Sequence, residues 1–386
     1  MADDFIVFGR PDIQQAEIDE VTATMESTWL GTGPKVQLFE ENFAEYQSLK
    51  PGYSAAVNSC TAALHVSLIA ADIGPGDEVI TTAMTFCATI NAIIHTGATP
   101  VLTDIEARSL NLDAEQIRAK ITEKTKAILI VHFAGRPCNM DEIVSLASEY
   151  NLKLIEDCAH AIESRWHGKA AGTFGDFGCF SFYVTKNIVT GEGGMVLART
   201  EDDIARIKML TLHGMSKDAW NRFGNSGYSH YEVVEAGYKY NMMDLQAAIG
   251  IHQLKRIDES WSRRERIWQH YQKEFSELPI QLPLEPEENT RHAYHLYTIN
   301  VDGQNCGVSR DDFLGQLTQL NIGAGVHYIS IPAHRYYVDR FGWRVENYPN
   351  AKFFGETTVS LPLSAVLSDQ EVERIVSGVK KLLSRA

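Results

Sequence analysis

The stretch that decides the fold is KAILIVHF (residues 126–133), followed by DEIVSLASEY (141–150) and LKLIE (152–156). The first and last segments are short apolar runs rich in aliphatic residues, which is typical of buried strands. The segment between them repeats apolar residues at helical spacing. Two buried strands joined by a helix form a βαβ unit, whose strands lie parallel in a sheet covered by helices on both faces. The stretch therefore predicts an α/β protein.

The same alternation extends toward the N-terminus. We predict helices and strands in turn at 61–72, 78–81, 85–95, 100–104 and 113–121. Together with the βαβ unit, these segments predict a mostly parallel sheet between two layers of helices. Ligands of such sheets bind outside the carboxyl ends of the strands, so we expect the functional residues there.

The pattern changes after residue 194. Helices are predicted at 202–212 and 242–256, and they bracket a segment at 216–240 that is rich in Gly, Tyr and Trp. A loop of this length inside a compact protein is usually functional or part of an interface. We predict a large α/β domain at 1–259, which includes an N-terminal arm, and a small C-terminal α+β domain at 260–386.

Charge and composition exclude several classes of protein. The 386 residues include 35 Lys and Arg against 50 Asp and Glu, so the net charge of −15 disfavours general nucleic-acid binding. No run of about 18 apolar residues is present, which excludes a membrane span. The acidic N-terminus does not resemble a signal peptide, and six scattered cysteines without a CxxC pair are typical of a reducing compartment. We expect a cytoplasmic protein without nucleic-acid or membrane partners.

The motif NSCT (58–61) lies directly before a predicted helix. Backbone N–H groups at a helix start, helped by the helix dipole and by hydroxyl groups, bind anions such as phosphate. Ser and Thr are also common as simple helix caps, and the motif alone leaves both interpretations open.

The motif LIEDCAH (154–160) places carboxylates at the end of a buried strand. Because side chains alternate along a strand, Glu156 and Asp157 face opposite ways and only one can address a given ligand. A buried carboxylate needs a partner, which a protonated pyridine nitrogen or backbone amides would provide.

The segment FSFYVTKN (180–187) places Lys186 between apolar strands and before the glycine-rich GEGG (191–194). Partial desolvation there would lower the lysine pKa and make the amine a nucleophile toward carbonyl groups. The alternative is a lysine in an exposed turn, which is the usual place of this residue type.

Together, these motifs resemble those of the fold-type-I enzymes that use pyridoxal 5′-phosphate, and within them the DegT/DnrJ/EryC1/StrS family of sugar aminotransferases. The resemblance runs through nearly the whole chain, and its most specific stretches are 156–160 and 181–194. Further stretches that resemble the family are 29–34, 74–79, 97–101, 132–135, 213–215, 237–241, 291–295 and 325–328.

The resemblance implies a role for each matching residue. Lys186 resembles the catalytic lysine that holds pyridoxal 5′-phosphate as an internal aldimine and later moves the proton. Asp157 resembles the carboxylate that keeps the pyridine nitrogen protonated. The other implied cofactor contacts are Cys60, Thr61 and Ser181 around the phosphate, Phe86 stacked on the ring, His160 near the phenolic oxygen, and Asn241 reaching the phosphate from the neighbouring subunit.

The resemblance also implies a homodimer with shared active sites, and it makes Thr32 and His327 candidate contacts of the substrate. Asn241 fits a helix cap as well, since it precedes a helix in a spacing similar to a capping box. No metal is expected, because His292 and His295 lack neighbouring Cys or acidic ligands in the sequence.

Within the family, the stretches 212–220, 237–241 and 326–328 most resemble the nucleotide-sugar 4-aminotransferases. These include the UDP-4-amino-4-deoxy-L-arabinose aminotransferase, which the stretch 306–310 also resembles. We therefore expect transfer of an amino group from L-glutamate to the C4 keto group of a nucleotide-linked 4-keto-6-deoxyhexose, with UDP as the expected nucleotide, in the biosynthesis of amino sugars for lipopolysaccharide or another glycan. One alternative is a C3 aminotransferase of a dTDP-3-keto-6-deoxyhexose, which shares every cofactor residue. The other is a non-catalytic sensor, which would have little reason to keep both Lys186 and Asp157. The dehydrating branch of the family carries histidine in place of the lysine, so Lys186 argues against it.

Overall fold

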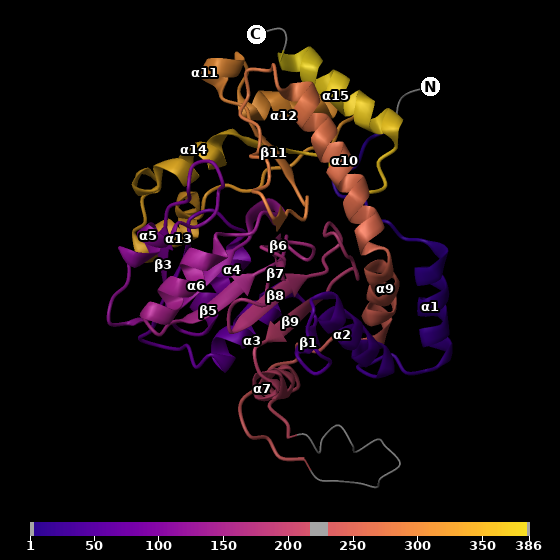
Figure 1. Cartoon of the computed structure of the whole chain (residues 1–386), viewed down its shortest axis with the longest axis vertical. Helices are drawn as coiled ribbons and strands as arrows, with labels where there is room; N and C mark the ends of the chain where they lie inside the picture. Colours follow the sequence, from indigo (N-terminus) through magenta and orange to yellow (C-terminus); the bar gives the residue numbers. More distant parts are fainter. Residues whose placement is uncertain (1–3, 217–230, 384–386) are drawn as a thin grey trace.

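A seven-stranded sheet lies at the centre of the molecule, with strand order β1-β9-β8-β5-β4-β2-β3 (Figure 1). The structure is a computed structural model that describes residues 4–216 and 231–383, so most of the long loop predicted at 216–240 lies outside the described residues. The strands of this sheet are β1 (Ser54–Val57), β2 (Glu78–Thr82), β3 (Thr99–Thr103), β4 (Thr125–Val131), β5 (Lys153–Asp157), β8 (Phe177–Ser181) and β9 (Gly194–Ala198).

The strands from β3 to β8 are all parallel, and β9 runs antiparallel to both of its neighbours, β8 and β1. Parallel strands of consecutive βαβ units end at the same edge of a sheet. Asp157 ends β5 and Ser181 ends β8 at this edge, while β9 begins there at Gly194. The topology therefore brings together residues that are far apart in the sequence.

Helices cover both faces of this sheet, as the apolar strands predict. Along β4, Ala127 and Leu129 pack into one buried cluster, while Ile128 and Ile130 pack into another on the opposite face. Both faces are buried, so the strands are apolar throughout rather than alternating with polar residues. The helices around the sheet are α1 (Gln15–Glu26), α2 (Pro34–Tyr46), α3 (Cys60–Ala70), α4 (Cys87–His95), α5 (Ala114–Arg118), α6 (Met140–Glu149), α7 (Glu201–Thr211) and α9 (Asp244–Lys255).

A third hydrophobic cluster lies toward the end of the molecule where both chain termini are found (Figure 1). It packs α10 (Ile257–Phe275), α12 (Arg310–Gln319) and α15 (Asp369–Leu383) against the antiparallel pair β11 (Tyr297–Asn300) and β12 (Thr358–Leu361). The predicted boundary between 259 and 260 falls inside α10, and the division into two domains stays a prediction. The remaining elements are β6 (Arg165–Trp166), β7 (Lys169–Ala170), β10 (Thr290–Arg291), α11 (Gly303–Cys306), α13 (Arg335–Phe341), α14 (Pro349–Thr357) and the 3-10 turns η1 (Phe133–Gly135), η2 (Ile331–Ala333) and η3 (Val345–Asn347).

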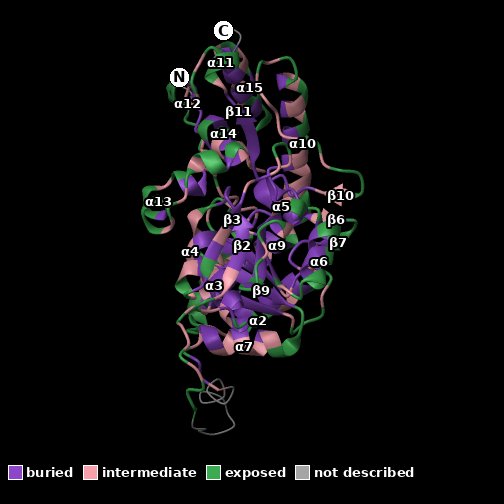
Figure 2. Cartoon of the chain, turned by 90° about the vertical axis from the view of Figure 1, so that its left-hand side faces the viewer, coloured by how far each residue is buried: buried purple, intermediate pink, exposed green. Residues whose placement is uncertain are grey.

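Buried residues follow the central strands and the inner sides of the helices, and the exposed residues lie on the outer helix faces (Figure 2). Among the described residues, no helix is both long enough and apolar enough to cross a bilayer. The α/β class predicted from the βαβ pattern is confirmed, because a mostly parallel sheet lies between two layers of helices.

Candidate active site

A cavity of about 470 Å³ opens at the edge of the sheet where the parallel strands end. Its wall is built from strand ends, the starts of α3 and α4, the N-terminal segment and the loop before η2. The structure brings eight of the ten predicted site residues to this cavity: Cys60, Thr61, Phe86, Asp157, His160, Ser181, Lys186 and His327.

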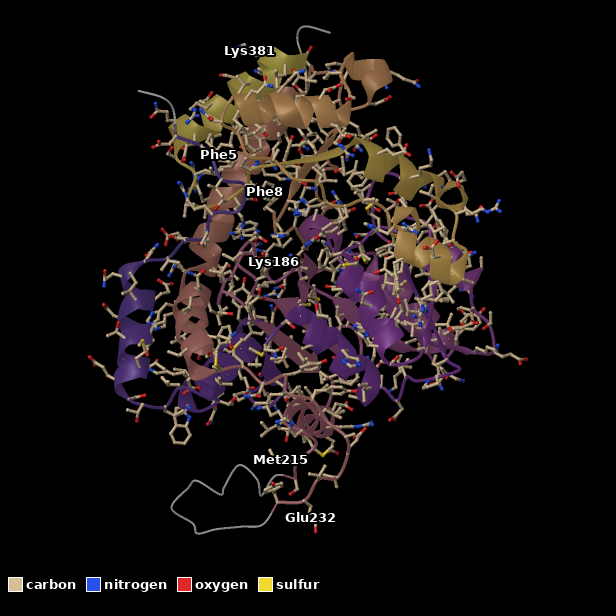
Figure 3. The ribbon with its side chains drawn as sticks, turned by 180° about the vertical axis from the view of Figure 1, so that it is seen from behind. Phe5, Phe8, Lys186, Met215, Glu232 and Lys381 are labelled. Atoms are coloured by element: carbon tan, nitrogen blue, oxygen red, sulfur yellow. The ribbon has the colours of Figure 1, made fainter. Side chains whose placement is uncertain are left out.

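Lys186 lies near the centre of the molecule, in the turn that follows β8 (Figure 3). Its backbone N–H donates to the carbonyl of Tyr183 at 2.8 Å, which holds the turn tight. Burial lowers the pKa of the amine to about 8, although Cys60 and Asp157 act in the opposite direction. Near neutral pH a small but useful fraction of the amine is therefore uncharged, which is the form that attacks a carbonyl group.

Asp157 is the buried last residue of β5. Its carboxylate accepts hydrogen bonds from the Thr89 hydroxyl at 2.9 Å and from the Ala159 N–H at 3.1 Å. Burial raises the pKa of this carboxyl, and the bonds from Ala159 and Thr89 and the charge of Lys186 offset only part of the effect. A carboxylate in this state gains from a cationic N–H partner placed in the cavity.

The start of α3 forms one wall of the cavity, with Ser59, Cys60 and Thr61 among its lining residues. The Ser59 hydroxyl accepts from the N–H of Ala62 at 3.1 Å, so the helix-cap interpretation of this motif is confirmed for Ser59. Gly194 packs directly on this helix start, because a Cβ at that position would lie 2.7 Å from the Ser59 carbonyl carbon. The helix dipole and the N–H groups of the first turn make this wall suited to an anion such as phosphate.

His160, Phe86 and His327 lie on other parts of the cavity wall. Phe86, the residue that precedes α4, is 56% exposed and lines the cavity. Burial, and next the charge of Lys186, lowers the pKa of His160 well below its usual range and that of His327 to about 4. Both rings are therefore neutral at physiological pH.

Thr32 and Asn241 do not line this cavity within the chain. They meet at a separate hollow, where the Asn241 amide donates to the Thr32 hydroxyl at 2.6 Å and that hydroxyl donates to the Met242 carbonyl at 2.5 Å. The Asn241 Oδ1 atom is buried and has no hydrogen-bond partner among the described residues.

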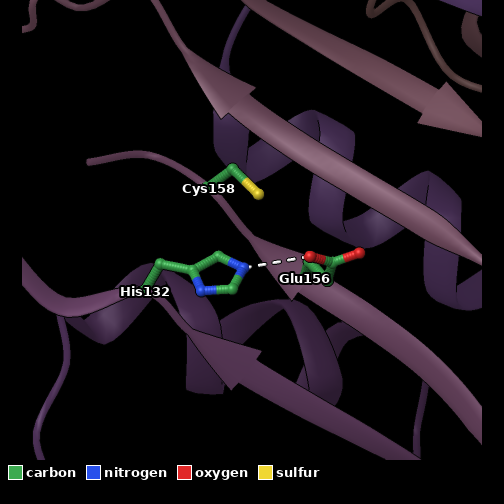
Figure 4. Close-up of side chains that lie close together, drawn as sticks. All are labelled: His132, Glu156 and Cys158. Carbon is green, nitrogen blue, oxygen red and sulfur yellow. Dashed lines mark hydrogen bonds and ion pairs between the residues drawn. The ribbon is translucent and has the colours of Figure 1, made fainter. Parts of the chain in front are cut away.

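Beneath the cavity, His132 and Glu156 form a buried pair with Cys158 beside them (Figure 4). Glu156 accepts from His132 at 3.0 Å and from three backbone N–H groups at 2.7 Å each, those of residues 172, 174 and 175. The other ring nitrogen of His132 accepts from the Cys138 N–H at 3.0 Å. The ring nitrogens of His132 and the carboxylate of Glu156 are thus paired within the chain and tie the end of β5 to its neighbours, while Asp157 is the carboxylate that lines the cavity.

Sequence reasoning missed several residues of the cavity. Thr89, which bonds Asp157, and Tyr328, which contacts His160, received no role, and the N-terminal residues 8–12 were not expected to line the site. These contacts join residues that are 68 and 168 positions apart in the sequence, so no local spacing of residues predicts them. The only signal for Tyr328 was its place in the family-like stretch 325–328.

The comparisons with known proteins agree with this geometry. The model of the DegT/DnrJ/EryC1/StrS aminotransferase family matches residues 11–380. The chain is 46% identical to the spore coat polysaccharide biosynthesis protein SpsC of Bacillus subtilis over 383 residues, covering 99% of this chain and 98% of that protein.

Solved structures give the same result. The Streptococcus pneumoniae protein Spr1654 in its PMP form is 34% identical with a TM-score of 0.91, covering 98% of this chain and 99% of that one, and the same protein is known in a PLP form. Helicobacter pylori PseC, an aminotransferase involved in the biosynthesis of pseudoaminic acid, is 28% identical with a TM-score of 0.91, and both chains are covered completely.

The residues present in the cavity fit pyridoxal 5′-phosphate. Lys186 offers an amine of lowered pKa for its aldehyde, Asp157 a buried carboxylate for its ring nitrogen, and the start of α3 an anion site for its phosphate. The match over almost the whole chain and this set of residues lead to the same conclusion. The protein belongs to the DegT/DnrJ/EryC1/StrS aminotransferase family, a family of pyridoxal 5′-phosphate-dependent sugar aminotransferases.

Proposed function

We propose that this protein moves an amino group from L-glutamate to the C4 keto group of a nucleotide-linked 4-keto-6-deoxyhexose, with UDP as the nucleotide. The products are 2-oxoglutarate and a nucleotide-linked 4-amino sugar. The observation that carries the proposal is the meeting of Lys186, Asp157 and the start of α3 in one cavity. The sugar as acceptor is supported by PseC, which works in pseudoaminic acid biosynthesis, and by SpsC, which works in polysaccharide biosynthesis.

Three parts of the cavity would hold the cofactor. The N–H groups at the start of α3, with Thr61 and Ser181, would bind its phosphate, and Phe86 would cover one face of its ring. Asp157 would accept the ring N–H. When bound, pyridoxal 5′-phosphate supplies an electron-withdrawing ring and an aldehyde that carries the amino group between donor and acceptor.

Lys186 would perform the proton transfers. Its pKa of about 8 lies near the working pH, which suits an amine that must both take and give a proton in one turnover. The neutral rings of His160 and His327 would leave Lys186 as the basic group among them. Asp157 would remain ionised once a cation is paired with it, because an opposite charge offsets the cost of burial.

The preference for C4 is supported by the likeness of residues 212–220, 237–241 and 326–328 to the nucleotide-sugar 4-aminotransferases, although residues 217–220 lie outside the part of the chain that the structure describes. His327 lies in the cavity, its Nδ1 atom 2.9 Å from the Ser360 hydroxyl and its ring stacked on Phe8 at 5.2 Å, so one edge is anchored. We infer that His327 contacts the sugar. Thr32 would act only where a second copy of the chain brings its separate hollow to this cavity.

Visible absorption of the purified protein with pyridoxal 5′-phosphate tests the proposal. L-glutamate should abolish the band of the bound cofactor, and a UDP-4-keto-6-deoxyhexose should restore it. The dTDP-3-keto-6-deoxyhexose is the matched comparison, since a C3 aminotransferase would respond to it instead. A band that ignores glutamate would point to another amino donor, and restoration only by the 3-keto sugar would overturn the C4 assignment.

A further inference from the structure

The hydroxyl of Tyr328 is a polar group of the cavity wall to which the family resemblance assigned no role. Tyr328 lies in the loop before η2, its ring centroid 5.7 Å from that of Phe86 and 6.3 Å from that of Phe133. Its oxygen lies 3.0 Å from the Nε2 atom of His160. The question is which of the two groups gives the proton in this hydrogen bond.

A backbone hydrogen bond to the His160 ring identifies His160 as the donor. The Ala134 N–H donates to the Nδ1 atom of His160 at 3.2 Å, so Nδ1 carries a lone pair. A neutral imidazole with an unprotonated Nδ1 must carry its proton on Nε2. Burial keeps the ring neutral by holding its pKa far below the usual range. His160 therefore donates its one N–H to the oxygen of Tyr328.

A second histidine packs behind the first and keeps it in place. The ring of His295 lies 4.5 Å from that of His160, and its Nδ1 atom lies 3.0 Å from the Asn187 Oδ1 atom. The Asn187 amide nitrogen donates to Glu163 at 2.9 Å and to the Ala293 carbonyl at 3.1 Å, which fixes the direction of the amide. His295 consequently donates its Nδ1–H to Asn187. The Nε2–H of His160 and the Nδ1–H of His295 are therefore both engaged in hydrogen bonds within the chain.

Since the Tyr328 oxygen accepts a hydrogen bond from His160, its own O–H remains available to a group in the cavity. Burial raises the pKa of this phenol, so the hydroxyl stays protonated over the whole working range. Tyr328 thus meets the requirements of a fixed hydrogen-bond donor: a protonated hydroxyl, an orientation imposed by a neighbour, and a place on the cavity wall.

We propose that Tyr328 donates the hydrogen bond to the phenolate oxygen of bound pyridoxal 5′-phosphate, and that His160 is a positioning residue that turns the Tyr328 hydroxyl into the cavity. The inference rests on the cofactor site of the proposed function and not on the identity of the sugar. It refines the expectation that His160 lies near this oxygen, because the His160 N–H is directed at Tyr328 instead.

A donor on the phenolate oxygen stabilises negative charge there, and the proton held beside that oxygen is released more readily. Loss of the Tyr328 hydroxyl should therefore raise the pH at the midpoint of the absorbance change of the bound cofactor. The titratable groups that face His160 and Tyr328 are Lys186, Asp157, His295, His327 and Cys87, and all of them remain in the variants below.

The experiment is a pH titration of the visible spectrum, together with the dissociation constant of the cofactor, for Tyr328→Phe, His160→Ala and His160→Gln. Tyr328→Phe should raise the midpoint by about one pH unit or more and weaken cofactor binding. His160→Ala should shift it in the same direction, and the double variant should shift it no further than Tyr328→Phe alone. His160→Gln should restore the wild-type midpoint, because a glutamine amide can accept from Ala134 and donate to Tyr328.

The matched control is Tyr337→Phe, which removes a hydroxyl bonded to Asn91 at 2.8 Å and absent from the cavity lining, and it should leave the midpoint unchanged. A wild-type midpoint in Tyr328→Phe with a shift only in His160→Ala would overturn the inference, since His160 would then be the donor. Additive shifts in the double variant would overturn it as well. A wild-type protein that binds no cofactor would instead contradict the proposed function.

Discussion

Lys186 owes its chemistry to burial, and burial of an amine has a cost for the folded chain. Its pKa of about 8 lies below the ordinary lysine value of about 10.4. Between these two pH values the native chain binds fewer protons than the unfolded chain, so the contribution of Lys186 to stability rises with pH across this window. Below pH 8 the full free-energy cost of burying the charged amine is present. Function and stability oppose each other at this residue.

Lys186→Met should therefore raise the melting temperature of the cofactor-free protein at pH 7 by a few °C, since it removes a buried charge but keeps an unbranched apolar side chain. Thermal melting at pH 7 and pH 10 measures this. The advantage over wild type should be smaller at pH 10, because wild-type Lys186 is then mostly neutral. An equal advantage at both pH values would contradict the lowered pKa.

At Asp157, too, we expect the charge that function requires to lower stability, and here the charge is negative. Its raised pKa means that the ionised carboxylate costs stability at neutral pH, when no cation is paired with it. Asp157→Asn should make the cofactor-free chain more resistant to urea at pH 7 and lower turnover by about 100-fold or more. The Thr89 hydroxyl can rotate to accept from the new amide, so the change is nearly isosteric. A variant that is both less stable and fully active would contradict the assigned role.

At the scale of elements, the sequence predicted those parts of the site that lie beside a recognisable element boundary. Asp157 at the end of β5, Lys186 after β8 and Cys60 at the start of α3 were each found in this way. Predicted helices at 61–72 and 242–256 correspond to α3 and α9 to within two residues, because apolar spacing and glycine stops are local signals. The helix predicted at 113–121 is shorter, since α5 ends at Arg118.

What the sequence could not show are the contacts made across the fold. Tyr328 reaches His160 over 168 positions, and Thr89 reaches Asp157 over 68. Such contacts depend on how strand ends and loops meet in space, and no periodicity encodes that. The placing of Thr32 and Asn241 at a second hollow has the same origin, because a motif gives a residue's type and position in the chain but not which cavity it faces.

The close contact between β9 and the start of α3 should determine how well the chain binds the cofactor phosphate. A Cβ on Gly194 would lie 2.7 Å from the Ser59 carbonyl carbon and 2.8 Å from the Cys60 nitrogen, and these backbone atoms cannot move without displacing the start of α3. Gly194→Ala should weaken binding of pyridoxal 5′-phosphate by about tenfold or more, because the N–H groups of that turn lose their alignment. Fluorescence titration of the cofactor-free protein measures the affinity.

The matched control is Gly315→Ala in α12, where an added Cβ meets nothing within 4 Å. This variant should bind the cofactor normally and gain about 0.5 to 1 kcal/mol of stability, since alanine loses less backbone entropy than glycine in a helix. Wild-type affinity in Gly194→Ala would show that the alignment of the α3 start does not determine phosphate binding.

At the scale of the whole molecule, the site of one chain is incomplete if Asn241 acts on the cofactor of a neighbouring copy. Asn241 and Thr32 lie at a hollow distinct from the cavity of Lys186, and the Asn241 Oδ1 atom is buried without a partner among the described residues. If a second copy related by two-fold symmetry places each hollow against the other chain's cavity, both sites form by the same contacts.

Mixing two inactive variants tests this arrangement. Lys186→Ala removes the amine from one site, and Asn241→Asp places a negative charge against the phosphate of the other. In a dimer with shared sites, a mixed pair has one site with both wild-type residues, so equal mixing should restore about a quarter of wild-type turnover. Turnover after co-refolding or subunit exchange measures it, and each variant alone is the control. If the mixture stays as inactive as its components, then Asn241 serves the site of its own chain or none, and the two hollows are not brought together.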